Sequence, residues 1–145
     1  MPALCDVNFL VALSHRAHQL HGAAKAWLDA GRGDAGLALC RVSQLGMLRL
    51  LTNPVIMKGE VCTTDEAWET HDKVMRDARF GYCEEPAGLQ TKLREFTRAF
   101  PFSPRLWQDA YLAAFAVSAG LGLVTFDQGF DKFAGLRPEI LMPPS

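Results

Sequence analysis

The sequence predicts an α/β fold in which a mainly parallel sheet is covered by helices on both faces. Short apolar segments alternate with helical segments along the chain, and no repeat, low-complexity segment or linker divides the 145 residues. Apolar strands that alternate with helices are typical of parallel sheets that are buried on both sides. We therefore expect a single domain over residues 1–145.

Composition places the chain among folded globular proteins, with 49% hydrophobic residues, 21% charged residues and a formal net charge of −1. There is no basic excess that would mark a nucleic-acid-binding protein, although acids elsewhere can hide a local basic patch. No apolar run approaches the ~20 residues that span a bilayer, and the N-terminus lacks the pattern of a signal peptide. We expect a cytoplasmic protein that does not enter the membrane.

The four cysteines contain no Cys-x-x-Cys pair, which excludes the usual spacing of a zinc or redox motif. Small buried side chains in a reducing compartment are the simpler interpretation. The residues concerned are Cys5, Cys40, Cys62 and Cys83.

The first half of the chain predicts these elements in order: a strand at 2–6, helices at 8–13 and 20–30, a turn at 31–34 and a strand at 36–40. A helix is expected over 43–51, with Ser43 as its N-cap and Asn53-Pro54 as its stop signal. The helical spacing of apolar residues predicts another helix over 64–79.

The second half predicts a strand at 80–84, a helix at 86–100, a helix at 103–118, a strand at 121–125 and a last strand at 139–141. Ser103-Pro104 combines a capping residue with proline at the first helical position. Gly120 is expected to end that helix.

Two acids follow predicted strands directly. Asp6 ends the first strand, and Asp127 follows the strand at 121–125. In parallel α/β sheets the functional crevice lies beyond the carboxyl ends of the strands, so both side chains are expected at one edge. Asp109 shares the apolar face of its helix, where an unpaired carboxylate is costly to bury. The three acids are therefore expected to lie together.

A cluster of this kind repels itself unless its pKa values rise or a cation binds, and the sequence offers no neighbouring cation. Carboxylate ligands suit Mg²⁺ or Mn²⁺, which activate water and stabilise charge on a phosphate during phosphodiester hydrolysis. Each acid also has a structural interpretation. Asp6 would cap the following helix, Asp109 would pair with Arg105, and Asp127 would be a turn residue. Asp131 would pair with Lys132 or face solvent.

Four segments resemble the PIN domain, and in particular the VapC-type toxins of bacterial toxin–antitoxin pairs. They are LCDVNFLVAL, RVSQLGMLRLLTNP, WQDAYLAAFAVSAG and LVTFDQGF, and they cover nearly the whole chain in the family's order. The resemblance implies a three-layer α/β/α sandwich and a Mg²⁺- or Mn²⁺-dependent endoribonuclease that acts on RNA. It also implies a homodimer and a VapB-like antitoxin that inserts a segment into the site, with DNA bound only through the antitoxin.

By position, Asp6, Asp109 and Asp127 match the acids that the family uses for metal binding and catalysis. Asn8 and Thr125 match polar residues that support the first and last of these acids. One acid is missing, because Gly46 stands where the family commonly places a glutamate, three residues before Arg49.

Three residues bear on that gap. Ser43 lies one turn before Gly46 and would reach a metal through water, while Asp131 would supply the missing charge. Arg49 is expected near the acids, either as a substrate contact or in a structural ion pair.

Two other classes of function stay open at this point. With a degenerate site, the same fold would be an RNA-binding or antitoxin-binding module that acts in operator regulation. A phosphoaspartyl protein would fit Asp6, but Asn8 replaces the second aspartate of the phosphatase pattern and no lysine ends a late strand.

His18 and His21 have metal-binding spacing without a third ligand, and His71 is expected at the surface.

Overall fold

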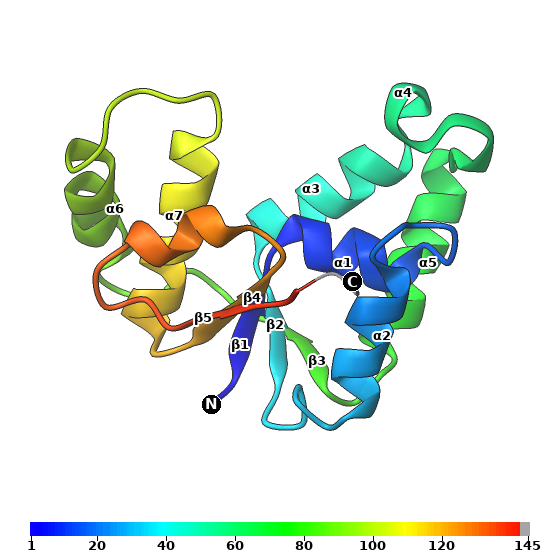
Figure 1. Cartoon of the computed structure of the whole chain (residues 1–145), viewed down its shortest axis with the longest axis horizontal. Helices are drawn as coiled ribbons and strands as arrows, with labels where there is room; N and C mark the ends of the chain where they lie inside the picture. The colour runs from blue at the N-terminus through cyan, green and yellow to red at the C-terminus, as the bar shows by residue number, and fades with distance from the viewer. Residues whose placement is uncertain (143–145) are drawn as a thin grey trace.

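A five-stranded parallel sheet forms the centre of the protein, seen here in a computed structural model that describes residues 1–142 (Figure 1). The strands run in the order β3-β2-β1-β4-β5, so the predicted parallel sheet is confirmed. Their bounds are β1 Ala3–Cys5, β2 Leu37–Leu39, β3 Phe80–Tyr82, β4 Gly122–Thr125 and β5 Pro138–Ile140. Every predicted strand is present, within two residues of its expected ends.

Helices connect the strands and cover both faces of the sheet. Their bounds are α1 Val7–Ser14, α2 His21–Asp29, α3 Arg41–Leu51, α4 Pro54–Met57, α5 Thr64–Met75, α6 Leu89–Arg98 and α7 Leu106–Ala119. Two 3₁₀ turns complete the described chain, η1 Lys58–Glu60 and η2 Gln128–Lys132. No helix within residues 1–142 is long and apolar enough to cross a membrane.

The alternation of side chains along the strands separates two apolar cores. Ala3 and Cys5 of β1 pack with α1, α2, α3 and α5, whereas Leu4 between them packs with α6 and α7. Successive side chains of a strand point to opposite faces, so both faces of this sheet are buried. Figure 1 shows α6 and α7 on one side of the sheet and α1, α2 and α5 on the other. The expected α/β/α sandwich is therefore present.

Two helix starts differ from the prediction. The N-cap of α3 is Cys40, and Ser43 lies at the third helical position, where its side chain bonds back to the cap. The N-cap of α7 is Arg105, because Ser103-Pro104 forms a turn ahead of the helix. Gly120 ends α7 in the left-handed conformation, at φ 70°, as expected from its lack of a Cβ.

Two further helix boundaries differ from the predicted ones, at Asn53 and at Met75. Asn53 follows the end of α3, as predicted, but it is also the N-cap of α4. Its side chain accepts hydrogen bonds from the backbone amides of Val55 and Ile56. The helix predicted over 64–79 ends at Met75, and Asp77 and Arg79 then form a turn before β3. Neither α4 nor η2 was expected from the sequence.

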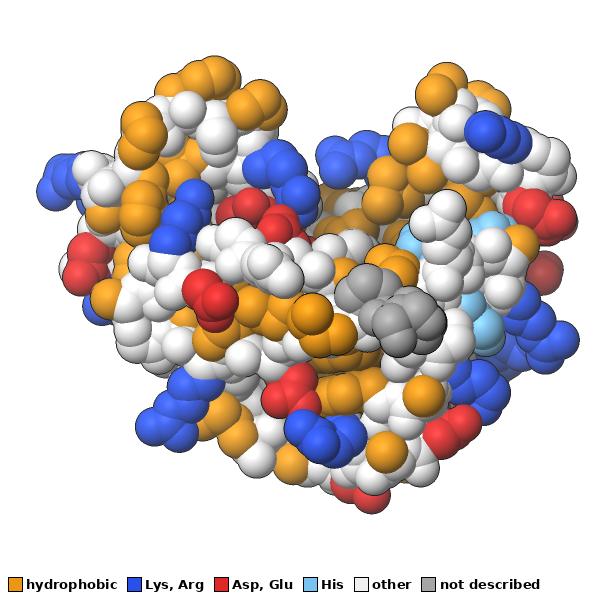
Figure 2. All heavy atoms as spheres, in the orientation of Figure 1, with side chains coloured by type: hydrophobic (Ala, Val, Ile, Leu, Met, Phe, Trp, Pro, Cys, Tyr) orange, Lys and Arg blue, Asp and Glu red, His pale blue; other side chains and the backbone are white. Residues whose placement is uncertain are grey.

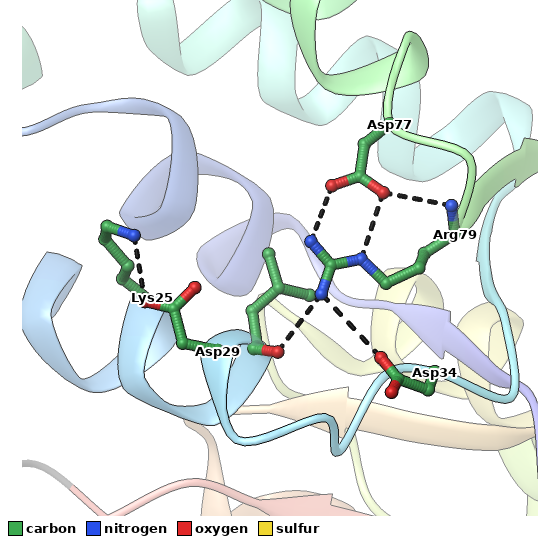
Figure 3. A network of polar contacts seen from close by, with 6 residues as sticks. Lys25, Asp29, Asp34, Asp77 and Arg79 are labelled. Carbon is green, nitrogen blue, oxygen red and sulfur yellow. Dashed lines mark hydrogen bonds and ion pairs between the residues drawn. The ribbon is translucent and has the colours of Figure 1, made fainter.

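At the amino edge of the sheet, Arg79 forms the network of polar contacts in Figure 3. Its guanidinium donates to both carboxylate oxygens of Asp77, at 3.0 and 2.6 Å, and to the Leu28 carbonyl at 3.1 Å, and it lies 3.8 Å from Asp34. The hydrogen bonds from Arg79 lower the pKa of Asp77 to about 2. Arg79 therefore neutralises acids at this edge and joins α2 to the turn before β3.

Candidate metal centre

The site is built where the strand order reverses, between β1 and β4. These neighbouring parallel strands start connections that leave in opposite directions, and such a switch point opens a crevice beyond the strand ends. Asp6 directly follows β1, and Asp127 follows β4 by two residues. The predicted placement of these two acids at one edge is confirmed.

The hydroxyl of Thr125 links the two acids. Its Oγ1 donates to Oδ2 of Asp6 at 2.7 Å and accepts from the backbone amide of Asp127 at 2.9 Å, and Thr125 is fully buried. Oδ1 of Asn8 accepts from the Phe126 amide at 3.3 Å, which fixes the same loop. Thr125 and Asn8 therefore hold the backbone that carries Asp127, and Thr125 also bonds directly to the carboxylate of Asp6.

Asp109 is the third acid and projects from the first turn of α7. Its side chain is only 13% exposed, and Oδ1 is buried without a hydrogen-bond partner among the described residues. Burial raises the pKa of Asp109 to about 6, with smaller contributions from the charges of Asp6 and Asp127. Burial also raises the pKa of Asp6. The charges of Asp6 and Asp127 both raise the pKa of Asp109, and the charge of Asp127 also raises the pKa of Asp6. The three carboxylates therefore lie close enough to interact electrostatically.

The three acids also make the structural contacts that were the alternative to metal binding: Asp6 and Asp127 cap helices, and Asp109 lies near Arg105. Asp6 caps α1 through the Val7 amide at 2.7 Å, and Asp127 caps η2 through the Gly129 amide at 2.8 Å. A carboxylate has about four lone-pair sites, so these contacts leave capacity for a metal. Capping and metal binding are compatible functions of the same residues.

The expectation that no cation lies beside the three acids is wrong, because Arg105 contacts two of them. Its Nη1 lies 3.1 Å from Oδ2 of Asp127, and its Nη2 lies 3.7 Å from Oδ1 of Asp109. The spacing to Asp109 was visible in the sequence as an i,i+4 pair. The contact with Asp127 comes from packing of distant segments, and local spacing gives no signal for it.

The chemistry of the donors suits a hard divalent cation, since all three side chains are carboxylates and Oδ1 of Asp109 has no hydrogen-bond partner among the described residues. As the side chains stand, no group of three or more His, Cys, Asp or Glu residues within 1–142 is arranged to hold a metal ion. The guanidinium of Arg105 between Asp109 and Asp127 is a physical reason for this difference.

The position of the missing acid is filled by a neighbouring side chain. A Cβ added at Gly46 would lie 2.4 Å from Cγ2 of Val7, so α3 and α1 are in contact at this point. The expectation for Ser43 is wrong: its buried hydroxyl accepts from the Cys40 amide at 3.0 Å and donates to the Cys40 carbonyl at 3.1 Å. Ser43 is a capping residue of α3 and is not oriented toward a metal.

The remaining candidates lie outside the cluster. Asp131 is exposed in η2 and makes no hydrogen bond or ion pair with another described residue. Arg49 is exposed in the last turn of α3 and has no ion pair within the described chain, so the structural alternative is not seen. His71 is buried, contrary to expectation, because its Nε2 lies 3.2 Å from the side-chain nitrogen of Gln44 in the α3–α5 contact.

Figure 2 shows a hollow between the part of the molecule that contains α6 and α7 and the part that contains α3 and α4. Acidic side chains lie toward its base, and basic side chains flank it on both sides. A negatively charged centre between positive walls suits a metal ion beneath a phosphate backbone.

Comparison with known proteins agrees with the fold. The model of the PIN domain family matches residues 3–136. The chain therefore belongs to the PIN domain family. Among its relatives, ribonuclease VapC41 of Mycobacterium tuberculosis is 37% identical over 142 residues, covering 95% of this chain and 97% of the relative. Ribonuclease VapC44 of the same organism is 34% identical over 133 residues, covering 88% and 87%.

Solved structures show the same fold at low sequence identity. VapBC2 from Rickettsia felis, bound to a promoter DNA fragment, aligns with a TM-score of 0.69 at 14% identity, over 98% of this chain and 100% of that chain. VapC20 of Mycobacterium tuberculosis, a toxin that cleaves the sarcin–ricin loop, aligns with a TM-score of 0.63 at 17% identity, over 94% and 99%.

Proposed function

We propose that this protein is the toxin of a VapBC-type pair and hydrolyses RNA phosphodiester bonds with a divalent metal ion. Membership of the PIN family and 37% identity to a VapC ribonuclease support the class of reaction. The observation that supports the site is a chain of contacts at the β1–β4 switch point: Thr125 links Asp6 to Asp127, and Arg105 lies against both Asp127 and Asp109. One buried oxygen of Asp109 has no hydrogen-bond partner among the described residues.

Each residue has a defined part in this proposal. Asp6, Asp109 and Asp127 hold Mg²⁺ or Mn²⁺, and Thr125 orients Asp6 through its 2.7 Å hydrogen bond. Asn8 fixes the backbone that carries Asp127. When bound, the ion activates water for attack on phosphorus and stabilises the charge that develops on the phosphate. The gap at Gly46 favours fewer protein ligands than the family pattern has.

The partners follow from the same family. Structural neighbours include VapBC complexes from Rickettsia felis and Salmonella typhimurium, both bound to DNA. We extend that assembly to this chain: a VapB-like antitoxin inhibits it and links it to operator DNA, and the toxin acts as a homodimer in the cytoplasm.

The test uses the chain purified free of antitoxin, structured RNA, and a titration of Mg²⁺ and Mn²⁺. We expect cleavage that depends on the metal and falls at least about 100-fold in Asp6→Asn, because one ligand loses its charge. Asp65→Asn is the matched control, since this exposed acid lies in the first turn of α5. Asp131→Asn is a separate arm that measures whether this residue supplies the missing charge.

A second candidate function is favoured by Gly46, because Val7 closes the position of the missing acid. In that case the protein binds RNA or antitoxin without cleaving. Equal activity in wild type and Asp6→Asn, or no activity in either, rejects the enzyme. Retained RNA binding in the same samples supports the binding module.

A further inference from the structure

Arg105 stands at an unusual position for a basic residue. It is the N-cap of α7 and makes no side-chain capping bond there. Helix N-termini favour acids and small polar caps, and a cation beside the positive end of the helix dipole is unfavourable. A compensating interaction is therefore required, and the two aspartates provide it.

The guanidinium bridges residues from separate elements. One nitrogen lies 3.1 Å from Asp127 in the loop after β4, and another lies 3.7 Å from Asp109 in α7. The planar fork of arginine can contact two carboxylates at once, whereas the compact ammonium of lysine acts as a single point charge. Arg105 thus places positive charge against two of the acids that would hold a metal ion.

The bridge is incomplete and reversible. The side chain of Arg105 is 60% exposed, while those of Asp109 and Asp127 are 13% and 24% exposed. At 3.7 Å the contact with Asp109 is too long for a hydrogen bond, and Oδ1 stays without a partner among the described residues. An exposed arm that only partly satisfies a buried acid can be displaced toward solvent by a stronger cation.

We propose that Arg105 is a built-in counter-cation that occupies the space between Asp109 and Asp127 in the metal-free protein and competes with the metal for these ligands. The inference rests on the proposed function, because it needs a cation site formed by these acids. It assigns Arg105 a positioning role: it holds the repelling carboxylates together until the ion replaces it.

The experiment measures metal binding directly, without RNA. Mg²⁺ and Mn²⁺ are titrated calorimetrically into metal-free wild type, Arg105→Gln and Arg105→Lys at neutral pH. We expect Arg105→Gln to bind roughly two- to fivefold more tightly, the range for loss of partly exposed ion pairs. Arg105→Lys keeps the charge but loses the fork, so its affinity should lie nearer to that of the Gln variant than to wild type.

A second readout is thermal unfolding in EDTA and in metal. Without metal, Arg105→Gln should unfold at a lower temperature than wild type, because the acids lose their counter-cation. Saturating metal should remove that difference, since tighter binding gives greater stabilisation. Arg94→Gln is the matched control: it removes the same charge from an exposed position of α6 and should change neither readout.

The outcomes separate this inference from the proposed function. Metal binding by wild type with equal or weaker binding by Arg105→Gln rejects the role of Arg105 and leaves the metal site intact. Tighter binding by Arg105→Gln with wild-type affinity in Arg105→Lys shows an effect of charge alone and rejects occupancy. Absence of binding in every protein rejects the metal site and the competition together.

Discussion

At the scale of single residues, the candidate site is a set of acids held in place by ordinary structural bonds. Asp6 caps α1, Asp127 caps η2, and Thr125 connects them through one buried hydroxyl. Asp109 differs, because one of its oxygens is buried without a partner among the described residues. Its carboxylate is the most costly of the three to keep charged in the absence of metal.

This cost predicts how Asp109→Asn changes the pH dependence of stability. Burial raises the pKa of Asp109 from 3.8 to about 6, so the folded state binds the proton more tightly than the unfolded state. The resulting stabilisation is complete below pH 4 and is lost as pH rises through 6. In EDTA at pH 7, Asp109→Asn should exceed wild type in unfolding free energy by about 3 kcal/mol, a difference that vanishes near pH 4.

Denaturant unfolding in EDTA across this pH range is the measurement, and metal binding is its complement. Because the ion needs the charged carboxylate, wild type should bind Mn²⁺ more tightly as pH rises from 5 to 7, and Asp109→Asn should bind it weakly throughout. A stability difference that does not change with pH would contradict the assignment of the raised pKa to Asp109.

Individual residues differ in how far the sequence could predict them. Asp6 and Asp127 could be predicted because each lies within two residues of a strand end, and the carboxyl ends of parallel strands meet at one edge. Ser43 was misplaced because the true cap, Cys40, is a rare residue at that position. The pairing of Arg105 with Asp127 depends on tertiary packing, which spacing along the chain does not encode.

At the scale of elements, the contact between α1 and α3 determines how many acids the site can have. Gly46 lets α3 approach α1 so closely that Cγ2 of Val7 would lie 2.4 Å from an added Cβ. Val7 directly follows Asp6, so the same contact also holds the start of α1 next to the first acid. The missing glutamate is thus part of a packing arrangement and not an isolated substitution.

Gly46→Ala tests this packing because two effects have opposite signs. Alanine stabilises a helix interior by up to about 1 kcal/mol relative to glycine. Overpacking against a buried neighbour costs about 1–3 kcal/mol, and the clash with Val7 is with a branched, buried side chain. We expect a net loss of about 1–2 kcal/mol in unfolding free energy, measured by urea denaturation.

The double variant Val7→Ala/Gly46→Ala provides the control. Shortening Val7 makes room for the new methyl group, so the double variant should lose less stability than the sum of the two single changes. Additive losses would show that the two helices do not meet at this point. A stabilising Gly46→Ala would show that α3 can move away from α1 at little cost.

Element types were easier to predict than element boundaries. All five strands were predicted, and the apolar signal is clearest in the inner strands β1, β2 and β4, which are largely buried on both faces. The edge strands β3 and β5 are more exposed, so their apolar signal is weaker. Three short elements, α4, η1 and η2, were missed. Both α4 and η2 begin at a residue that also marks a turn, Asn53 or Asp127, and η1 directly follows α4. A single turn of helix has too few residues to show periodicity.

At the scale of the whole molecule, the site lies where the two apolar cores meet the same edge of the sheet. Asp6 leads into α1 on one face, and Asp109 belongs to α7 on the other. Figure 2 shows basic side chains on both sides of the hollow between the part of the molecule with α6 and α7 and the part with α3 and α4. The net charge of −1 hides this arrangement, so overall charge could not predict a nucleic-acid surface.

RNA binding should therefore depend on salt through local contacts, and Arg49 is the predicted contact from α3. It is exposed and has no ion pair within the described chain, which leaves it free to meet a phosphate. With Asp6→Asn present to prevent cleavage, binding of single-stranded RNA is measured as a function of salt concentration. Loss of one phosphate contact lowers the slope of log K against log salt by about 0.7.

We expect Arg49→Gln to show that decrease in slope and weaker binding at low salt, with affinities that converge as salt rises. Arg76→Gln is the matched control, because this exposed arginine ends α5 at the opposite, amino edge of the sheet. Equal slopes for Arg49→Gln and its parent would remove Arg49 from the RNA surface. A decrease produced equally by Arg76→Gln would show that RNA responds to total charge and not to the walls of the hollow.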